Sequence, residues 1–187
     1  MIGYKIAIGI DQVDGPFLVV VKLETLPEST IITPNNKIQL VTECPIISYI
    51  EDILDVYDFP FVPNKKEIQQ YRTDMAIVRG IAPIKLDYKP DHWNNRAYSV
   101  HDISNRLDLP IAYLDSTAFT YINGKRVCSD LDIKPEHTCG YGIHFFESLE
   151  DAIYYFAYDF GAYLENNFRV INEAWIRKSK TLKELVK

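Results

Sequence analysis

The chain has 187 residues, of which 47% are hydrophobic and 25% are charged, as in an ordinary globular protein. We expect one domain spanning residues 1–187, large enough to bury a core without disulfides. The formal net charge of −6 repels a phosphate backbone, so the composition argues against nonspecific nucleic-acid binding. No apolar run reaches the ~20 residues that a membrane-spanning helix needs, so we expect no membrane insertion.

Cysteine usage and the first residues indicate a reducing compartment. The three cysteines, Cys44, Cys128 and Cys139, are an odd number and predict no disulfide framework. The opening residues, Met1–Lys5, lack the long apolar core of a signal peptide. We therefore expect a cytosolic protein.

The opening residues predict a β-hairpin. Residues 4–10 alternate isoleucine with smaller or polar residues, and residues 17–23 are β-branched and apolar. The segment between them, residues 11–16, carries the Asp, Gly and Pro of a turn.

A helix and three shorter elements follow in the first half. Apolar residues recur at helical spacing near 45–58, with a proline at the first turn. Short strands are predicted at 38–42 and 72–78, and the Pro- and Asn-rich segment 83–95 predicts a long surface loop.

The second half predicts further strands and two helices. Residues 97–101 are strand-like, and residues 119–128 predict a hairpin because Asn123-Gly124 is the preferred type I′ pair. A buried strand is expected at 142–146, followed by a helix near 149–165 that begins at a capping-box serine, Ser148.

A C-terminal helix near Thr181 lies in a basic, amphipathic tail, residues 166–187. We interpret its charges as a solvated face, with contact to an acidic partner or to nucleic acid as the alternative. Strands outnumber helices and are adjacent in sequence. The predicted fold class is therefore α+β, with a mostly antiparallel sheet built from hairpins.

The run from Cys139 to Phe146 places a thiol five positions before an imidazole, His144. Gly140 and Gly142 allow a tight entry into the strand, and we expect Cys139 to be buried there as a small apolar residue. Thiolate and imidazole also suit zinc, and the available ligands are Cys139, His144, His137 and either Cys128 or His101. Their spacing matches no zinc-finger pattern, so we expect no bound metal.

Two enzyme classes remain as alternatives. A hydrolase would need a thiolate, a base and an orienting acid, and Cys139, His144 or His101, and Asp102 supply these residue types. An ADP-ribosyltransferase-like site would use residues in the order Arg72, Tyr98-Ser99 and Glu147. The sequence contains no phosphate-loop or dinucleotide-binding motif, and we expect no cofactor.

Three segments together, residues 96–102, 119–127 and 137–152, resemble an uncharacterised domain family of large cytoplasmic DNA viruses that sometimes accompanies pentapeptide repeats. The half spanning 96–165 is similar to the family, whereas the half spanning 1–95 is more divergent. In the family pattern a cysteine often stands where this chain has Arg72-Thr73. A metal or disulfide pair with Cys139, if the family forms one, would therefore be missing in this chain.

The family has no agreed activity, so the resemblance implies a viral setting and a fold and transfers no catalytic residues. We expect an accessory or virion-associated protein of the host cytoplasm. With 13 Tyr and 9 Phe, the chain is rich in residues that favour contact surfaces. The sequence therefore favours a non-catalytic, homodimeric interaction module, using the Tyr-rich helix near 154–163 or a sheet edge, over an enzyme or a zinc-binding domain.

Overall fold

The computed structural model describes residues 1–39, 67–83, 89–103 and 109–159. The predicted helix near 45–58, the C-terminal helix and the basic tail lie outside these residues. Within them the fold is α+β and mostly antiparallel, as the sequence predicts. No helix in this described part is long and apolar enough to cross a membrane.

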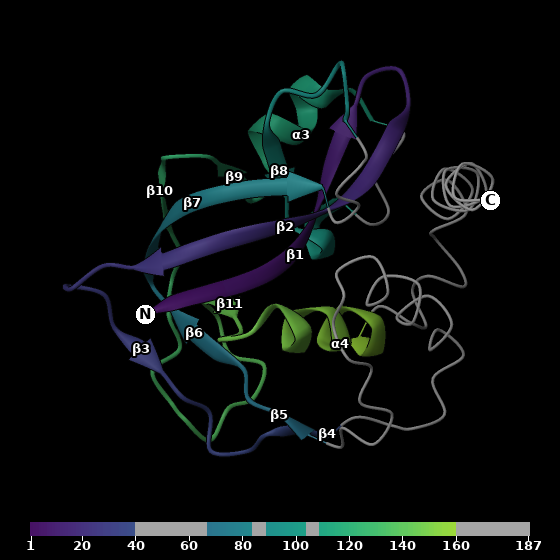
Figure 1. Ribbon diagram of the computed structural model, residues 1–187. Coiled ribbons are helices and arrows are strands. Elements are labelled where there is room, and N and C mark those ends of the chain that lie inside the picture. The colour runs from purple at the N-terminus through teal and green to yellow at the C-terminus, as the bar shows by residue number, and fades with distance from the viewer. Residues whose placement is uncertain (40–66, 84–88, 104–108, 160–187) are drawn as a thin grey trace.

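A six-stranded antiparallel sheet forms the centre of the fold (Figure 1). Its strands, in spatial order, are β10 (Arg126–Cys128), β7 (Met75–Pro83), β2 (Gly15–Thr25), β1 (Ile2–Asp11), β8 (Arg96–Tyr98) and β9 (Thr120–Ile122).

The predicted hairpin of residues 4–23 is confirmed as β1 and β2, which pair from Ile2↔Glu24 to Asp11↔Gly15. Its turn is fixed by the buried carboxylate of Asp11. One oxygen accepts the N–H groups of Val13 and Asp14, both at 2.8 Å, and the other accepts the N–H of His92 at 2.9 Å. One side chain therefore shapes the turn and ties residues 89–95 to it.

The predicted hairpin of residues 119–128 is wrong in its pairing. β9 pairs with β8 and β10 pairs with β7, so the two strands lie on opposite edges of the sheet. The chain does turn at Asn123-Gly124, but only Gly124 has a positive φ, of 77°, whereas a type I′ turn needs two.

The sheet curls so that its two edges approach each other at this turn. Gly124 N–H donates to the carbonyl of Val78 at 2.8 Å, and Val78 N–H donates to the carbonyl of Lys125 at 2.9 Å. The turn, which connects β9 to β10, is therefore hydrogen-bonded to β7.

Two smaller sheets complete the strands. One contains β11 (Ile143–Phe145), β6 (Tyr71–Thr73) and β3 (Ile31–Ile32), and the other pairs β4 (Ile38–Gln39) with β5 (Glu67–Ile68). The strand predicted at 72–78 is thus two strands, β6 and β7, in different sheets. The strand predicted at 142–146 is confirmed as β11.

Three helices are described. They are α2 (Val100–Ile103), α3 (Ile111–Thr117) and α4 (Leu149–Asp159). The predicted start of α4 is confirmed, because Ser148 Oγ accepts the N–H of Asp151 at 3.1 Å. The strand predicted at 97–101 is correct only as far as Tyr98, since α2 begins at Val100. The sequence did not predict α3.

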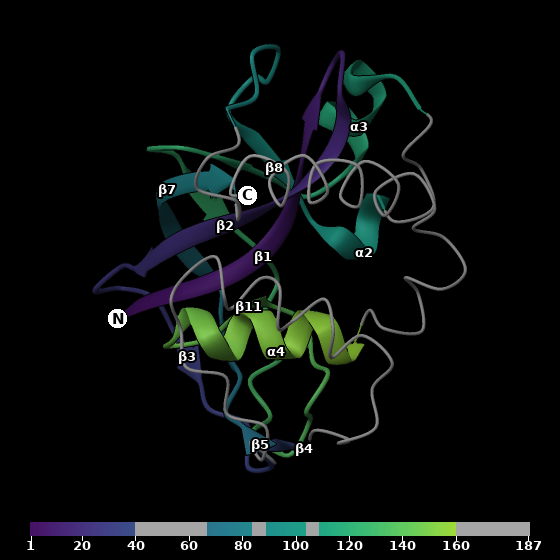
Figure 2. The ribbon, with the colours of Figure 1, turned by 45° about the vertical axis from the view of Figure 1, so that its right-hand side comes forward.

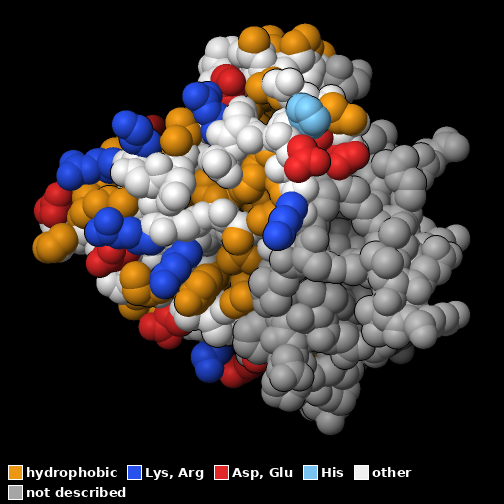
Figure 3. Space-filling model, turned by 45° about the horizontal axis from the view of Figure 1, so that its top comes forward, with side chains coloured by type: hydrophobic (Ala, Val, Ile, Leu, Met, Phe, Trp, Pro, Cys, Tyr) orange, Lys and Arg blue, Asp and Glu red, His pale blue; other side chains and the backbone are white. Residues whose placement is uncertain are grey.

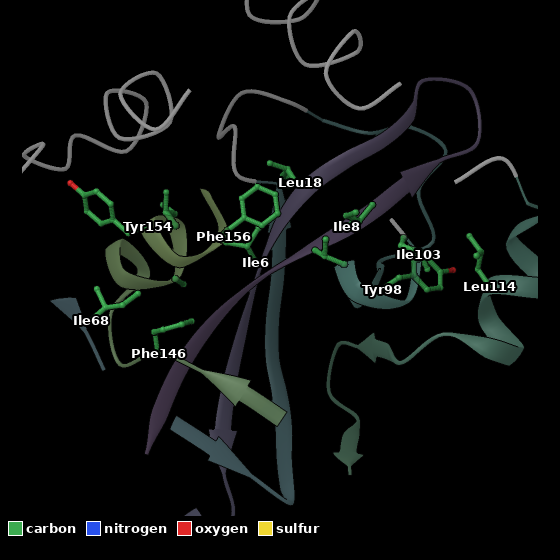
Figure 4. Close-up of a cluster of buried hydrophobic side chains, with 13 residues drawn as sticks. Ile6, Ile8, Leu18, Ile68, Tyr98, Ile103, Leu114, Phe146, Tyr154 and Phe156 are labelled. Carbon is green, nitrogen blue, oxygen red and sulfur yellow. The ribbon is translucent and has the colours of Figure 1, made fainter. Parts of the chain in front are cut away.

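The hairpin buries side chains on both of its faces, in two clusters. On one face, Ile6, Ile8 and Leu18 pack against α4 and against residues of α2 and α3 (Figure 4). Figure 2 shows α4 running alongside β1 on this side. On the other face, Ala7, Val19, Val21 and Leu23 pack with Val78, Tyr121, Val127 and Phe145. Each fully buried aliphatic or aromatic side chain contributes about 1.5–3 kcal/mol.

Gly3 in β1 provides a test of the second cluster. A Cβ at Gly3 would lie 2.1 Å from Cδ2 of Phe145, so Gly3→Ala must displace that ring. We expect the substitution to lower the free energy of unfolding by about 1–3 kcal/mol, measured by urea denaturation. Gly80→Ala in β7 is the matched control, since nothing lies within 4 Å of its Cβ position. Its stability should stay the same or rise, and an equal loss in both variants would contradict the contact.

The Asp11 carboxylate predicts how the stability of the fold depends on pH. Burial acts to raise the pKa of this carboxyl, but the N–H groups of Asp14, His92 and Val13 outweigh it and the pKa lies below its ordinary value. The resulting stabilisation is present above the unfolded pKa of about 3.9 and is lost as pH falls through the folded pKa.

We expect Asp11→Asn to lower the free energy of unfolding at pH 7 by about 1–3 kcal/mol. The difference from the wild type should shrink as the pH is lowered to about 3. The exposed Asp91 is the control, and Asp91→Asn should change stability by less than about 0.5 kcal/mol at either pH. A loss for Asp11→Asn that does not change with pH would contradict the role of the charge.

Candidate functional site

A fully buried arginine, Arg72 in β6, holds the loop that precedes β11. Its Nε donates to the carbonyl of Asp132 at 2.8 Å, Nη1 to that of His137 at 2.6 Å, and Nη2 to that of Lys134 at 2.6 Å. A guanidinium offers donors in a rigid planar fork, so three converging carbonyls fix the loop relative to β6.

The loop, residues 129–142, is also bonded within itself. Asp132 accepts the N–H of Lys134 at 3.0 Å and lies 2.6 Å from Nδ1 of His137, and its own N–H donates to the carbonyl of Tyr141 at 2.9 Å. The hydrogen bond from His137, followed by that from Lys134, lowers the pKa of Asp132 below its ordinary value. His137, proposed from the sequence as a zinc ligand, is therefore engaged by a carboxylate of its own loop.

Cys139 is exposed, so the expectation that it is buried is wrong. The tight passage belongs to the glycines on either side of Tyr141. A Cβ at Gly140 would lie 2.7 Å from Cβ of Asp132, and Gly142 has φ of +144° and would bring a Cβ within 2.9 Å of Leu131. The backbone therefore packs closely at the glycines, while the thiol between Thr138 and Gly140 faces solvent.

His144 lies in β11 directly opposite Arg72 of β6. Its Nε2 is 2.8 Å from the carbonyl of Gly140, and because a carbonyl can only accept, this nitrogen carries the proton. Burial first, and then the positive charge of Lys5, lower the pKa of His144 to about 4. The ring is therefore neutral at neutral pH.

The structure brings two of the four predicted site residues together. His144 and His101 both line a small pocket, together with the polar side chains of Lys5, Gln70 and Ser99. Burial lowers the pKa of Lys5 to about 8, and the charge of Asp102 acts in the opposite direction.

The other two predicted residues do not line this pocket. The exposed Cys139 is absent from it, so among the described residues no thiol meets the two imidazoles there. Asp102 instead accepts the N–H of Phe119 at 2.7 Å, which joins α2 to the start of β9. The arrangement therefore does not provide the thiolate, base and acid that a cysteine hydrolase needs.

The described residues form neither a zinc site nor an ADP-ribosyltransferase-like site. Across the described ranges, no three His, Cys, Asp or Glu side chains are grouped to hold a metal ion. Of the transferase candidates, Arg72 donates to three carbonyls, the Tyr98 hydroxyl donates to Asp115 at 2.6 Å, and Glu147 accepts from Tyr71 at 3.3 Å. Ser99 is the one member of that set in the pocket.

Sequence reasoning missed Lys5 and Gln70. Lys5 reads as a polar position in an alternating strand, and Gln70 falls between two short strands with no motif around it. Only the tertiary arrangement places these side chains beside His144.

Arg72 is the residue on which the loop depends most. We expect Arg72→Met to lower the free energy of unfolding by about 3–4 kcal/mol, because three carbonyls lose their donors. Arg72→Lys should be nearly as damaging, since a compact ammonium cannot reproduce the planar fork. Arg79 in β7, half-exposed and paired with Glu24, is the control, and Arg79→Met should cost less than about 1 kcal/mol by urea denaturation. Equal stabilities of Arg72→Met and Arg79→Met would contradict the anchoring role.

Comparison with known proteins adds no relative. No family model, no curated protein and no solved structure matches the chain.

Proposed function

We propose that this chain is a non-catalytic protein-interaction module that pairs with a second copy of itself through the loop of residues 129–142. The observation that carries the proposal is that this loop is firmly anchored yet presents two large apolar side chains to solvent. Tyr141 is 80% exposed and Ile133 is 68% exposed.

Anchoring supports recognition because an ordered loop loses less conformational entropy when a partner binds. The three bonds from Arg72 and the internal bonds of Asp132 hold the backbone on both sides of the exposed residues. Tyrosine is also among the side chains that most often dominate binding energy at protein interfaces.

The charges around the loop suit self-association. A twofold interface places the same patch against itself, so a patch of one sign would repel its copy. This loop instead carries both signs, with Lys134 next to Pro135 and Glu136, and the neighbouring β10 carries Arg126, which pairs with Glu28 at 3.5 Å.

A protein partner also fits the face drawn in Figure 3 better than nucleic acid does. On the face drawn in Figure 3, Lys and Arg side chains are interspersed with acidic and hydrophobic ones and form no continuous basic stripe. A basic stripe is the usual footprint of a nucleic-acid-binding surface.

The loop replaces the Tyr-rich helix as the proposed contact. Tyr154 of α4 is only 7% exposed and belongs to the core, and the Tyr155 ring packs against Phe146 with 5.0 Å between centroids. These two tyrosines support the fold, while Tyr163 lies outside the described residues.

The viral setting remains part of the proposal. It rests on the resemblance of residues 96–102, 119–127 and 137–152 to a family of large cytoplasmic DNA viruses. On that basis the protein acts as an accessory or virion-associated component in the host cytoplasm.

Self-association is tested by light scattering coupled to size-exclusion chromatography. We expect a mass of twice 21.6 kDa at micromolar concentrations near neutral pH. The double substitution Tyr141→Ser with Ile133→Asn should weaken the dimer by about tenfold or more, because it removes both exposed apolar side chains.

The matched control is Val13→Asn in the β1–β2 turn, which removes another exposed apolar side chain, 72% exposed, away from the loop. It should leave the mass unchanged. A wild-type monomer would contradict self-association, and a dimer that survives the double substitution would contradict the loop as its surface.

A further inference from the structure

A pocket lies along the edge of β1 that faces away from β2. Two other segments of the chain contact this edge, and the pocket lies between them. β1 bridges to Phe146, just after β11, at Tyr4, and it pairs with β8 at Ile8. Between these two contacts, Lys5 and Ile6 border a space of about 30 Å³. That volume holds one or two water-sized groups.

Segments far apart in the sequence form the walls. His144 comes from β11, while Ser99 and His101 come from the passage between β8 and α2. The remaining wall is apolar and aromatic, and its residues are Phe146 together with Tyr155 and Phe156 of α4.

The described lining of the pocket contains a basic side chain and no carboxylate. Among the described residues that line it, one is a lysine, two are histidines and none is Asp or Glu. The proton of His144 is held by Gly140, so this ring leaves only an acceptor nitrogen, and Lys5 is the residue that brings a positive charge to the pocket.

Gln70 provides an independent indication of a ligand. The residue is only 3% exposed, and its Nε2 finds no hydrogen-bond partner within the described part of the chain. Buried amide groups are normally paired, because an unpaired one loses its bonds to water without replacement. Gln70 therefore places an unpaired amide in the wall of the pocket that Lys5 also lines.

The backbone contributes in the same direction. Tyr4 exchanges both of its backbone hydrogen bonds with Phe146 across this edge of β1. Because both backbone groups of a residue in a strand point to the same edge at every second residue, the N–H and the C=O of Ile6 point toward the pocket, and the N–H is a further donor there.

We propose that this pocket binds the oxyanion group, carboxylate or phosphate, of a small ligand. Lys5 supplies the charge, and Gln70 and the Ile6 N–H supply neutral donors. The space admits one or two oxygen atoms of the anionic head, so the rest of the ligand lies at the mouth, against the aromatic side chains of α4. The exposed side chains of the 129–142 loop do not line the pocket, so this site stands apart from the proposed dimer surface.

The test is an NMR titration at pH 7 and constant ionic strength, with inorganic phosphate, benzoate and benzylamine as separate probes. We expect saturable shifts of the Gln70 side-chain amide and the Ile6 N–H with phosphate or benzoate. Saturation by phosphate assigns a phosphate group, and saturation by benzoate assigns a carboxylate on an apolar body. Failure of both anions to saturate, or tighter binding of benzylamine, would overturn the proposal.

Two substitutions and one control locate the binding. Lys5→Met keeps the apolar stem and removes the charge, so binding should weaken by about tenfold or more. Gln70→Leu removes the unpaired amide at similar volume, weakens binding to a smaller extent, and tests the site independently if Lys5→Met fails to fold.

Lys22→Met, in β2, removes the same charge from an exposed position and should leave binding unchanged. Equal losses of anion affinity in Lys5→Met and Lys22→Met would show that binding depends only on the overall charge of the protein, and would contradict the proposed site. A monomer that binds either anion would contradict the proposed dimer and leave this inference standing.

Discussion

The positions of the 129–142 loop and of β11 depend on the buried guanidinium of Arg72. Removing a charge from water costs several kcal/mol, and here three carbonyl oxygens of one loop offset that cost. Each bond to a charged donor contributes about 1.5–3 kcal/mol, provided that the geometry is kept. The loop can therefore take few other conformations, because any departure leaves a buried positive charge without its acceptors. Asp132, whose carbonyl is one of the three acceptors, also closes the loop on His137 and so reinforces the same arrangement.

The position of Arg72 also explains the run from Cys139 to Phe146. Arg72 pairs with His144 across β6 and β11, and its Cβ lies only 3.2 Å from the Cβ position of Gly142. Glycine is favoured here because its φ of +144° strains other residues, and because Leu131 and the Arg72 stem both lie close to the Cβ position. Once β11 is placed, its Ile143 and Phe145 enter one core cluster and Phe146 enters the other. The run from Cys139 to Phe146, whose residue types suggest a chemical site, therefore serves to connect the loop to both core clusters.

Local patterns predicted the parts of the fold that local forces decide. The β1–β2 hairpin follows from alternation and from the Asp11 turn, and the start of α4 follows from the Ser148 cap, which is encoded within four residues. The prediction of a 119–128 hairpin is wrong because Asn123-Gly124 specifies a reversal of the chain but does not specify which strand each flanking segment pairs with. Cys139 was expected in the core because thiols usually are buried, but here the glycines occupy the crowded positions. Two site residues, His101 and His144, were found by residue type, whereas Lys5 and Gln70 are defined only by tertiary proximity.

The acidic composition and an oxyanion pocket are compatible because they act over different distances. Most charged side chains of the described residues are exposed or partly exposed, and the fields of exposed charges are screened within about 8–10 Å at physiological salt. Lys5 and the donors around it act at hydrogen-bonding distance, where partial burial reduces screening and strengthens each interaction. Burial and the charge of Lys5 keep the His144 ring neutral, so the pocket does not accumulate a second buried cation of its own. Net charge therefore argues against a polyanion binding over a wide surface, while the local donors select a single anionic group that enters the pocket.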